Sequence, residues 1–179
     1  MCEYCGCREI TVIGRYTLEH EAIVNLLTEL RTASQAVAGE AAGPADAAGR
    51  ARLRAAAQAM AGALDPHTVG EEQGLFAVLR EDPDFEPHVK ALCAEHVHLD
   101  AQLASVAAGE PAAYERFEHA LRAHIDKEEN GLFPAAAVAL SGEQWEQIVA
   151  SLDALDHSSG TIEIEPHGHS ATHSPHPLQ

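Results

Sequence analysis

The ten residues "HTVGEEQGLF" at 67–76 recur as "HIDKEENGLF" at 124–133, with the histidine, both glutamates, the glycine, the leucine and the phenylalanine in register. Six matches between two windows of this length arise by chance in about one chain in a hundred of this composition. A histidine and a glutamate four residues apart on a helix differ by about 40° around its axis, so their side chains converge. The repeat therefore predicts two equivalent helical pairs, His67 with Glu71 and His124 with Glu128.

A second, shorter sequence similarity lies outside the repeat. "EHEAI" at 19–23 and "EHVHL" at 95–99 share a Glu-His pair followed by an aliphatic residue three positions after the histidine. His20 and His96 both fall on the apolar stripe of an expected helix. Each half of the chain thus contributes one helix with the Glu-His pair and one helix with the repeated HxxxEE motif.

The composition favours an all-α protein with a single core. The 179 residues suffice for one domain of about 100–150 residues with tails. Alanine and leucine dominate, aromatic residues make up 4% of the chain, and runs of β-branched residues are scarce. Helix-forming residues therefore outweigh strand-forming ones.

Apolar spacing and helix breakers divide the chain into five expected helices. The first carries an apolar stripe formed by Leu18, Ile23, Val24, Leu27 and Leu30. A loop at 38–49 precedes a second helix over about 50–79, in which Pro66 predicts a kink with Asp65 as a cap. The third is expected over about 87–107, and the fourth begins at Pro111 and ends or bends at Pro134. A fifth opens with a capping-box pattern, Ser141 and Gln144, and fades near Asp156.

The histidines fit an up-down four-helix bundle. Two histidines on neighbouring antiparallel helices share a height only when the turn lies halfway between them in the chain. The halfway points between the four successive histidines fall at 43–44, 81–82 and 110, each within an expected loop. Four histidines and two glutamates therefore meet at one level of the bundle.

A metal site accounts for these six groups better than isolated core histidines do. Buried charges without partners are costly, and the inward stripes carry nothing basic to pair with them. Six donors exceed what one tetrahedral zinc needs, whereas two first-row ions bridged by the glutamates use them all. Glu72 and Glu129 point about 100° away, which suits a solvated face or a contact behind a ligand. His88, His98 and His119 lie off the inward stripes and are expected at the surface.

These residues resemble the hemerythrin-like, or HHE cation-binding, family. The resemblance spans about residues 11–137 and rests on an EHxxI helix, an HxxxEE helix ending in LF, an EHxxL helix and an HxxxEExxLFP helix. It implies a four-helix bundle around a non-haem di-iron centre, with Glu71 and Glu128 as bridging carboxylates. The ligand set it implies is His20, His67, Glu71, His96, His124 and Glu128.

The chain departs from the oxygen-carrying hemerythrins at two positions. Asp100 stands where they have a second histidine four residues after the third-helix ligand, and Glu128 follows His124 by four residues where they have an aspartate five residues on. These departures argue against reversible oxygen transport. The open coordination positions would take water, peroxide, nitric oxide or oxygen, or a side chain such as Asp100 or Tyr16.

Three of the four cysteines crowd into "MCEYCGC" at 1–7, a start that resembles that of actinobacterial members of the family. Disulfides closing loops of two or three residues would stabilise a fold little, so reduced thiols or metal-bound thiolates are the better interpretations. Cys2, Cys5 and Cys7 supply three soft donors for a zinc or iron site that a tail histidine would complete. A redox-active thiol pair and no role at all stay open.

The expected organisation has three parts: a cysteine-rich arm at 1–10, the bundle with its extra helix at 11–156, and a disordered histidine-rich tail at 157–179. The formal net charge of −17 and the lack of an arginine cluster argue against nucleic-acid binding. No stretch reaches about 18 apolar residues and the start lacks a secretory signal pattern, so we expect a cytoplasmic protein without membrane contact.

Two function classes follow from the sequence. The first is a non-haem di-iron protein, with two bridged iron ions, that binds or reacts with O2, peroxide or NO in oxidative-stress defence. Whether it is an enzyme, such as one that decomposes peroxide, stays open. The alternative is a non-enzymatic iron or redox sensor, or an iron-handling protein, in which the metal stabilises the bundle.

Overall fold

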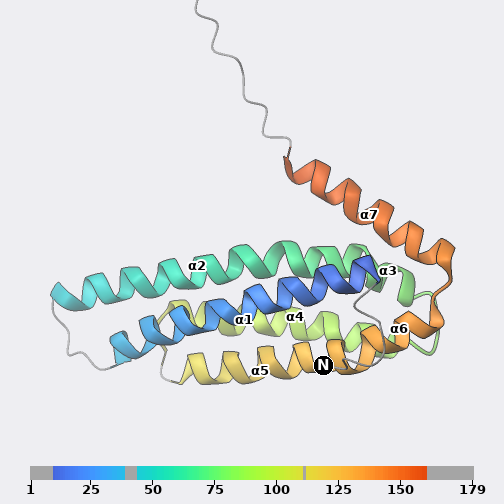
Figure 1. Cartoon of the computed structure of the whole chain (residues 1–179). Helices are drawn as coiled ribbons and strands as arrows, with labels where there is room; N and C mark the ends of the chain where they lie inside the picture. Colours follow the sequence, from blue (N-terminus) through green and yellow to red (C-terminus); the bar gives the residue numbers. More distant parts are fainter. Residues whose placement is uncertain (1–9, 39–43, 111, 161–179) are drawn as a thin grey trace, which may run out of the picture.

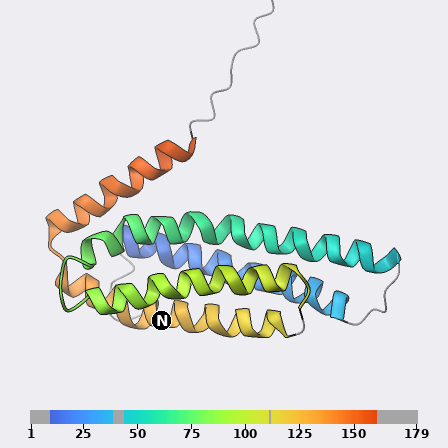
Figure 2. The ribbon, with the colours of Figure 1, turned by 180° about the vertical axis from the view of Figure 1, so that it is seen from behind.

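The computed structural model describes residues 10–38, 44–110 and 112–160, and every regular element in these ranges is helical. Four long helices run alternately up and down side by side, as the two opposite views in Figures 1 and 2 show. They are α1 (Thr11–Ala38), α2 (Pro44–Gln73), α4 (Glu86–Ala107) and α5 (Ala113–Lys127). The predicted all-α four-helix bundle is confirmed.

Shorter elements continue two of these helices at one end of the bundle. After a turn at Gly74, α2 is followed by α3 (Leu75–Leu79). The fourth helix passes into a single π-helical turn, η2 (Glu128–Leu132), and then into α6 (Phe133–Ala139). The extra C-terminal helix is α7 (Gly142–Gly160), which lies outside the bundle (Figure 1).

The prolines have less effect on the helices than the sequence pattern predicted. Pro44 opens α2 six residues earlier than expected, because a first-turn proline lacks only an N–H that would stay unpaired. The second helix continues through Pro66, so the prediction of a restart at Asp65 was wrong. Pro134 lies in the first turn of α6 and does not end the helical run.

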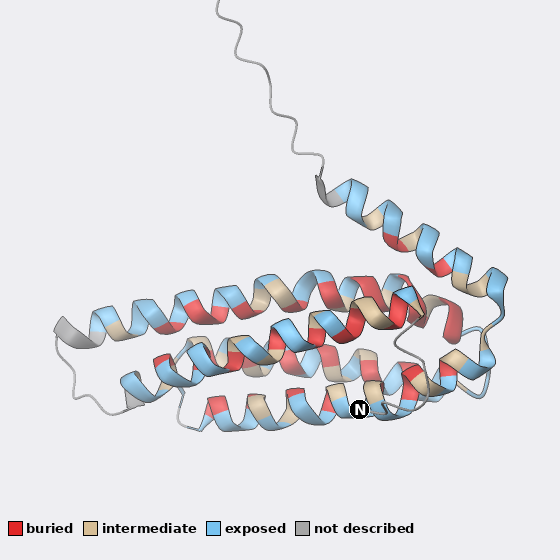
Figure 3. Ribbon diagram, in the orientation of Figure 1, coloured by how far each residue is buried: buried red, intermediate tan, exposed pale blue. Residues whose placement is uncertain are grey.

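Two apolar clusters fill the bundle, and a polar layer separates them. One contains Ile23, Leu64, Leu99 and Leu121, and the other contains Tyr16, Leu75, Leu92 and Leu132. Helices α1 and α4 enter both clusters, whereas α2 and α5 reach the second one through their continuations, α3 and η2 with α6. The four histidines lie between the two clusters in the chain. Figure 3 shows these buried residues along the inner faces. Leu18, expected on the inner stripe of α1, is instead 66% exposed.

The extra helix α7 packs on the outside of α1, α2 and α3. Its Ile148 and Leu152 are buried in the apolar cluster at that end. The predicted capping box is present, since the Ser141 N–H donates to Gln144 Oε1 at 2.9 Å and the Gln144 N–H donates to Ser141 Oγ at 3.3 Å. The helix extends to Gly160, four residues beyond the expected end.

Residues 1–9 and 161–179, which hold most of the predicted arm and tail, lie outside the described residues. The three-part division of the chain stays a prediction. Among the helices that the structure describes, none combines the length and the apolar character needed to cross a membrane.

The two glycines of the repeat should respond differently to an added methyl group. A Cβ at Gly74 would lie 2.6 Å from the Gly70 carbonyl oxygen and 3.0 Å from Leu152 Cδ2, whereas a Cβ at Gly131 meets nothing within 4 Å. We expect Gly74→Ala to lower the free energy of unfolding by about 1–3 kcal/mol. Gly131→Ala should leave it unchanged or raise it by about 0.5–1 kcal/mol. Urea unfolding followed by circular dichroism measures both, and equal losses would contradict the packing at Gly74.

Candidate metal centre

The polar layer between the two apolar clusters consists of six side chains, each at most 4% exposed: His20, His67, Glu71, His96, His124 and Glu128. They come from all four long helices, with Glu128 at the start of the π-helical turn η2. The structure thus brings together the six residues that the sequence placed at one level.

The six side chains form two overlapping groups. His20 and His67 share one group with both glutamates, and His96 and His124 share the other group with the same two glutamates. Within each group, one ligand atom from every residue lies within 4.8 Å of all the others. Glu71 and Glu128 therefore stand between two sets of imidazoles, as carboxylates that bridge two ions would.

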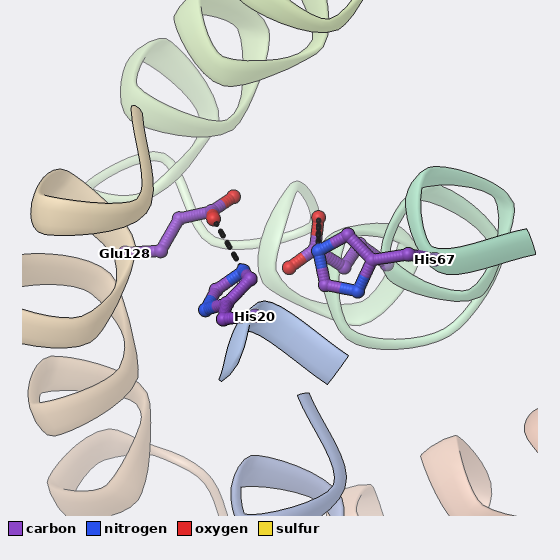
Figure 4. Close-up of side chains that lie close together, drawn as sticks. His20, His67 and Glu128 are labelled. Atoms are coloured by element: carbon purple, nitrogen blue, oxygen red, sulfur yellow. Dashed lines mark ion pairs between the residues drawn. The ribbon is translucent and has the colours of Figure 1, made fainter. Parts of the chain in front are cut away.

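The imidazole Nε2 atoms face the carboxylates. His20 Nε2 lies 3.2 Å from Glu128 Oε2, and His67 Nε2 lies 3.5 Å from Glu71 Oε2 (Figure 4). In the second group, His96 Nε2 lies 3.3 Å from Glu71 Oε2 and His124 Nε2 lies 3.2 Å from Glu128 Oε1. Both groups therefore have nearly the same geometry.

The centre of the layer is rich in buried acceptor atoms. All four carboxylate oxygens of Glu71 and Glu128 are buried without a hydrogen-bond partner. The Nε2 atoms of His96 and His124 face each other at 3.0 Å, although two neutral imidazoles that meet in this way would both present lone pairs. A buried acceptor without a donor is costly. Cations at the two groups would satisfy these atoms, so the residues fit a pair of metal ions.

A ring of four more glutamates holds the outer edge of the imidazoles. Each histidine donates its Nδ1–H to a carboxylate: His20 to Glu129 at 3.1 Å, His67 to Glu19 at 2.8 Å, His96 to Glu72 at 2.8 Å and His124 to Glu95 at 3.0 Å. We call these four residues the outer glutamates. A proton held on Nδ1 leaves the Nε2 lone pair free for the centre.

The outer glutamates link the helices in a closed circuit. Glu19 of α1 binds a histidine of α2, Glu72 of α2 binds one of α4, and Glu95 of α4 binds one of α5. Glu129 of η2 closes the circuit on α1. From the sequence, Glu72 and Glu129 were expected either on a solvated face or in contact with the back of a ligand. In the structure, both bind a ligand histidine. Glu19 and Glu95 were not predicted from the sequence. Each directly precedes one ligand histidine in the shared "EH" pair, but binds a different one on the neighbouring helix.

The phenylalanines of the repeat pack against the histidines. Phe76 stacks on the His96 ring with the ring centroids 5.9 Å apart and an interplanar angle of 6°. Phe133 stacks on His20 at 5.8 Å and 8°. The two halves of the chain therefore build two nearly identical half-sites, related by an approximate two-fold axis. The repeat thus contains an inner ligand pair, an outer glutamate and an aromatic wall.

The carboxylates make the site attractive to positive charge. Burial disfavours the charged form of His20, but Glu128 and Glu129 outweigh it and raise its pKa to about 9. Burial acts in the same way on His96, where Glu71 and Glu72 raise the pKa to about 9. Metal ions compete with these protons, so cation binding should release protons from the site.

The other predicted ligands do not join the cluster in the described residues. Tyr16 is buried, and its hydroxyl donates to the Gly70 carbonyl oxygen at 2.8 Å. Burial and then the charge of Glu71 raise the pKa of Tyr16, so its hydroxyl stays protonated. Asp100 lies exposed on α4, near Asp65, and belongs to neither group of donors. Cys2, Cys5, Cys7 and the histidines beyond residue 160 lie outside the described residues, and a zinc site there stays a prediction. His88, His98 and His119 are exposed, as expected.

The fold and the site together define a helical bundle with a buried cation site of imidazoles and carboxylates. A family model, the hemerythrin HHE cation binding domain, matches residues 11–136. The chain therefore belongs to the hemerythrin HHE cation-binding family. Searches of curated proteins and of solved structures found no match. The only cluster of suitable donors within the described residues is the one above, so we take it as the candidate cation site.

The outer glutamates should set the affinity of the site for cations. Glu129 and Glu72 are equivalent in the two half-sites, but their side chains are 9% and 39% exposed. We expect Glu129→Gln to weaken metal binding by about 10–100-fold, because the amide no longer accepts as an anion from His20. Glu72→Gln should have a smaller effect, because water reaches that position. Competition with a chromophoric chelator measures the affinity.

Glu29→Gln, at an exposed position of α1, serves as the control and should bind metal like the unaltered chain. An unchanged affinity of the Glu129→Gln variant would show that the outer glutamates do not position the ligands.

Proposed function

We propose that the chain is a non-haem di-iron protein that binds or reacts with O2, peroxide or NO. The observation that carries this proposal is that Glu71 and Glu128 belong to both groups of donors. Two histidines and two shared carboxylates per ion leave coordination positions for a small ligand. The family supports a cation site, and the step from cation to a pair of iron ions is the proposal.

The donor chemistry favours iron over a closed structural zinc. Structural zinc sites take four donors and most often use thiolates. Here each group has only imidazole and carboxylate donors, and the carboxylates are shared. Carboxylate-bridged pairs of iron ions in the core of a helical bundle use the same kind of donors. Iron, when bound, would supply the redox chemistry and the positions at which O2, peroxide or NO attaches.

The walls of the site restrict its ligands to small molecules. Both bridging glutamates are fully buried, and Phe76 and Phe133 cover the outer faces of two histidines. Apolar clusters close the layer above and below. A diatomic molecule or peroxide could reach such a centre by local motion, whereas a larger organic substrate would have to unpack the core.

The chain's own groups would hold protons and exclude water. Each outer glutamate keeps a proton on an imidazole Nδ1 and so keeps Nε2 directed at the centre. Glu72 is 39% exposed and could pass protons between solvent and the edge of the site. Removal of peroxide or NO by such a site would serve oxidative-stress defence, and the proposal includes this role in the cytoplasm.

Metal stoichiometry tests the bridging arrangement. After anaerobic reconstitution we expect two iron ions per chain. His20→Ala should keep about one, because the other group retains all four of its donors. Glu71→Gln should lower occupancy at both positions, because Glu71 belongs to both groups. Iron analysis with circular dichroism as the folding control gives the readout. A chain that holds a single ion, or a Glu71→Gln variant with two, contradicts the proposal.

Rapid-mixing absorption spectroscopy tests the ligand. The reduced, iron-loaded chain should give new near-ultraviolet or visible bands with at least one of O2, hydrogen peroxide and NO. His124→Ala, which disrupts one group, should give weaker bands or none. Consumption of peroxide over many turnovers would identify an enzyme, and reversible binding without turnover would identify a carrier or sensor. A well-loaded chain that responds to none of the three contradicts the proposed function.

A further inference from the structure

The two halves of the bundle differ in what covers them on the outside. His20 is equivalent to His96, 76 residues later, and His67 is equivalent to His124, 57 residues later. The same offsets pair residues 11–31 of α1 with 87–107 of α4, and residues 56–79 with 113–136. Surfaces that the approximate two-fold axis relates can therefore be compared residue by residue.

In the first half, α7 covers the groove between α1 and the end of α2. Leu152 Cδ2 lies 3.6 Å from the Cβ position of Gly70 and 3.0 Å from that of Gly74. Ile148, one turn earlier on α7, is buried in the same apolar cluster. Two aliphatic side chains four residues apart thus seal this groove.

In the second half, the equivalent groove is open. It is a cavity of about 640 Å³ between the first turns of α4 and the run from η2 to α6. At the equivalent positions, Leu92 replaces Tyr16, Lys127 replaces Gly70 and Gly131 replaces Gly74. Ala91, Gly131 and Ala135 line it with small, exposed residues. A helix could therefore approach this surface closely at Gly131, as α7 approaches Gly74.

Each groove has a basic side chain on the equivalent glutamate, although the two basic residues come from different positions, since Arg15 is equivalent to Ala91 and Lys127 to Gly70. Beside the covered groove, Arg15 donates to Glu19 at 2.8 Å and to Asp156 of α7 at 2.9 and 3.1 Å. Beside the open groove, Lys127 donates to Glu95, the equivalent of Glu19. The Lys127 side chain is 55% exposed, which leaves room for a second carboxylate.

We propose that the groove between α4 and α6 binds an amphipathic helix of a partner protein. The helix presents two aliphatic residues four positions apart and an acidic residue four positions further on, as Ile148, Leu152 and Asp156 do in α7. The aliphatic pair fills the groove over Ala91, Gly131 and Ala135, and the carboxylate binds Lys127. A second copy of the chain is a poorer fit, because its own α7 already buries Ile148 and Leu152.

A synthetic peptide that carries the α7 sequence is the probe. Fluorescein-labelled peptide with residues 142–157 is titrated with the full, metal-loaded chain, and fluorescence anisotropy reports binding. We expect saturable binding with a dissociation constant below about 100 μM. A peptide with Ile148→Ala and Leu152→Ala should bind at least tenfold more weakly. A peptide with Asp156→Asn should lose about two- to fivefold, the effect of one exposed ion pair.

Groove variants locate the binding site. Gly131→Arg places a large charged side chain in the groove, where an added Cβ meets nothing within 4 Å, and should weaken peptide binding at least tenfold, with an unchanged melting temperature. Ala101→Arg, at an exposed position of α4 that does not line the groove, is the control and should bind normally. No saturable binding, or equal binding by both variants, overturns the proposal. A stable dimer that Gly131→Arg dissociates also overturns it, because the groove would then belong to a second copy.

Discussion

Glu71 and Glu128 are two buried carboxylates without hydrogen-bond donors, and the groups around them are arranged to compensate their charge. Anions at the centre of an apolar bundle are tolerated only when positive charge lies between them. Four imidazoles face these carboxylates, and the pKa values of His20 and His96 rise in response. The chain belongs to a cation-binding family, and bound cations would supply the partners that these carboxylates lack.

The outer glutamates couple the packing of the helices to the geometry of the site. Each binds a histidine of the next helix, so the circuit that orients the ligands also fixes the helices at one height. The phenylalanines of the repeat complete the arrangement by stacking on histidines of a different helix. Each of the two ten-residue copies therefore contains an inner histidine and glutamate, an outer glutamate and a stacking phenylalanine.

Symmetry inside the bundle coexists with asymmetry outside it. The inner residues repeat, so both groups contain two histidines and the same two glutamates. The outer surfaces differ at equivalent positions, such as Tyr16 and Leu92, or Gly70 and Lys127. One half accepts α7, with Gly74 too close to Leu152 for a larger side chain, and the other half keeps an open groove.

The helical class, the bundle topology and the six inner residues follow from the sequence, because helical spacing and the positions of the loops can be read along the chain. The sequence did not predict Glu19 and Glu95 as partners of His67 and His124, since a contact between neighbouring helices depends on their relative rotation. The exposure of Asp100 and Leu18 and the continuation of α2 through Pro66 became apparent only in the folded structure. The placement of α7 over one half of the bundle also depends on the folded structure, because it rests on contacts between residues far apart in the chain, such as Leu152 with Gly74 and Asp156 with Arg15.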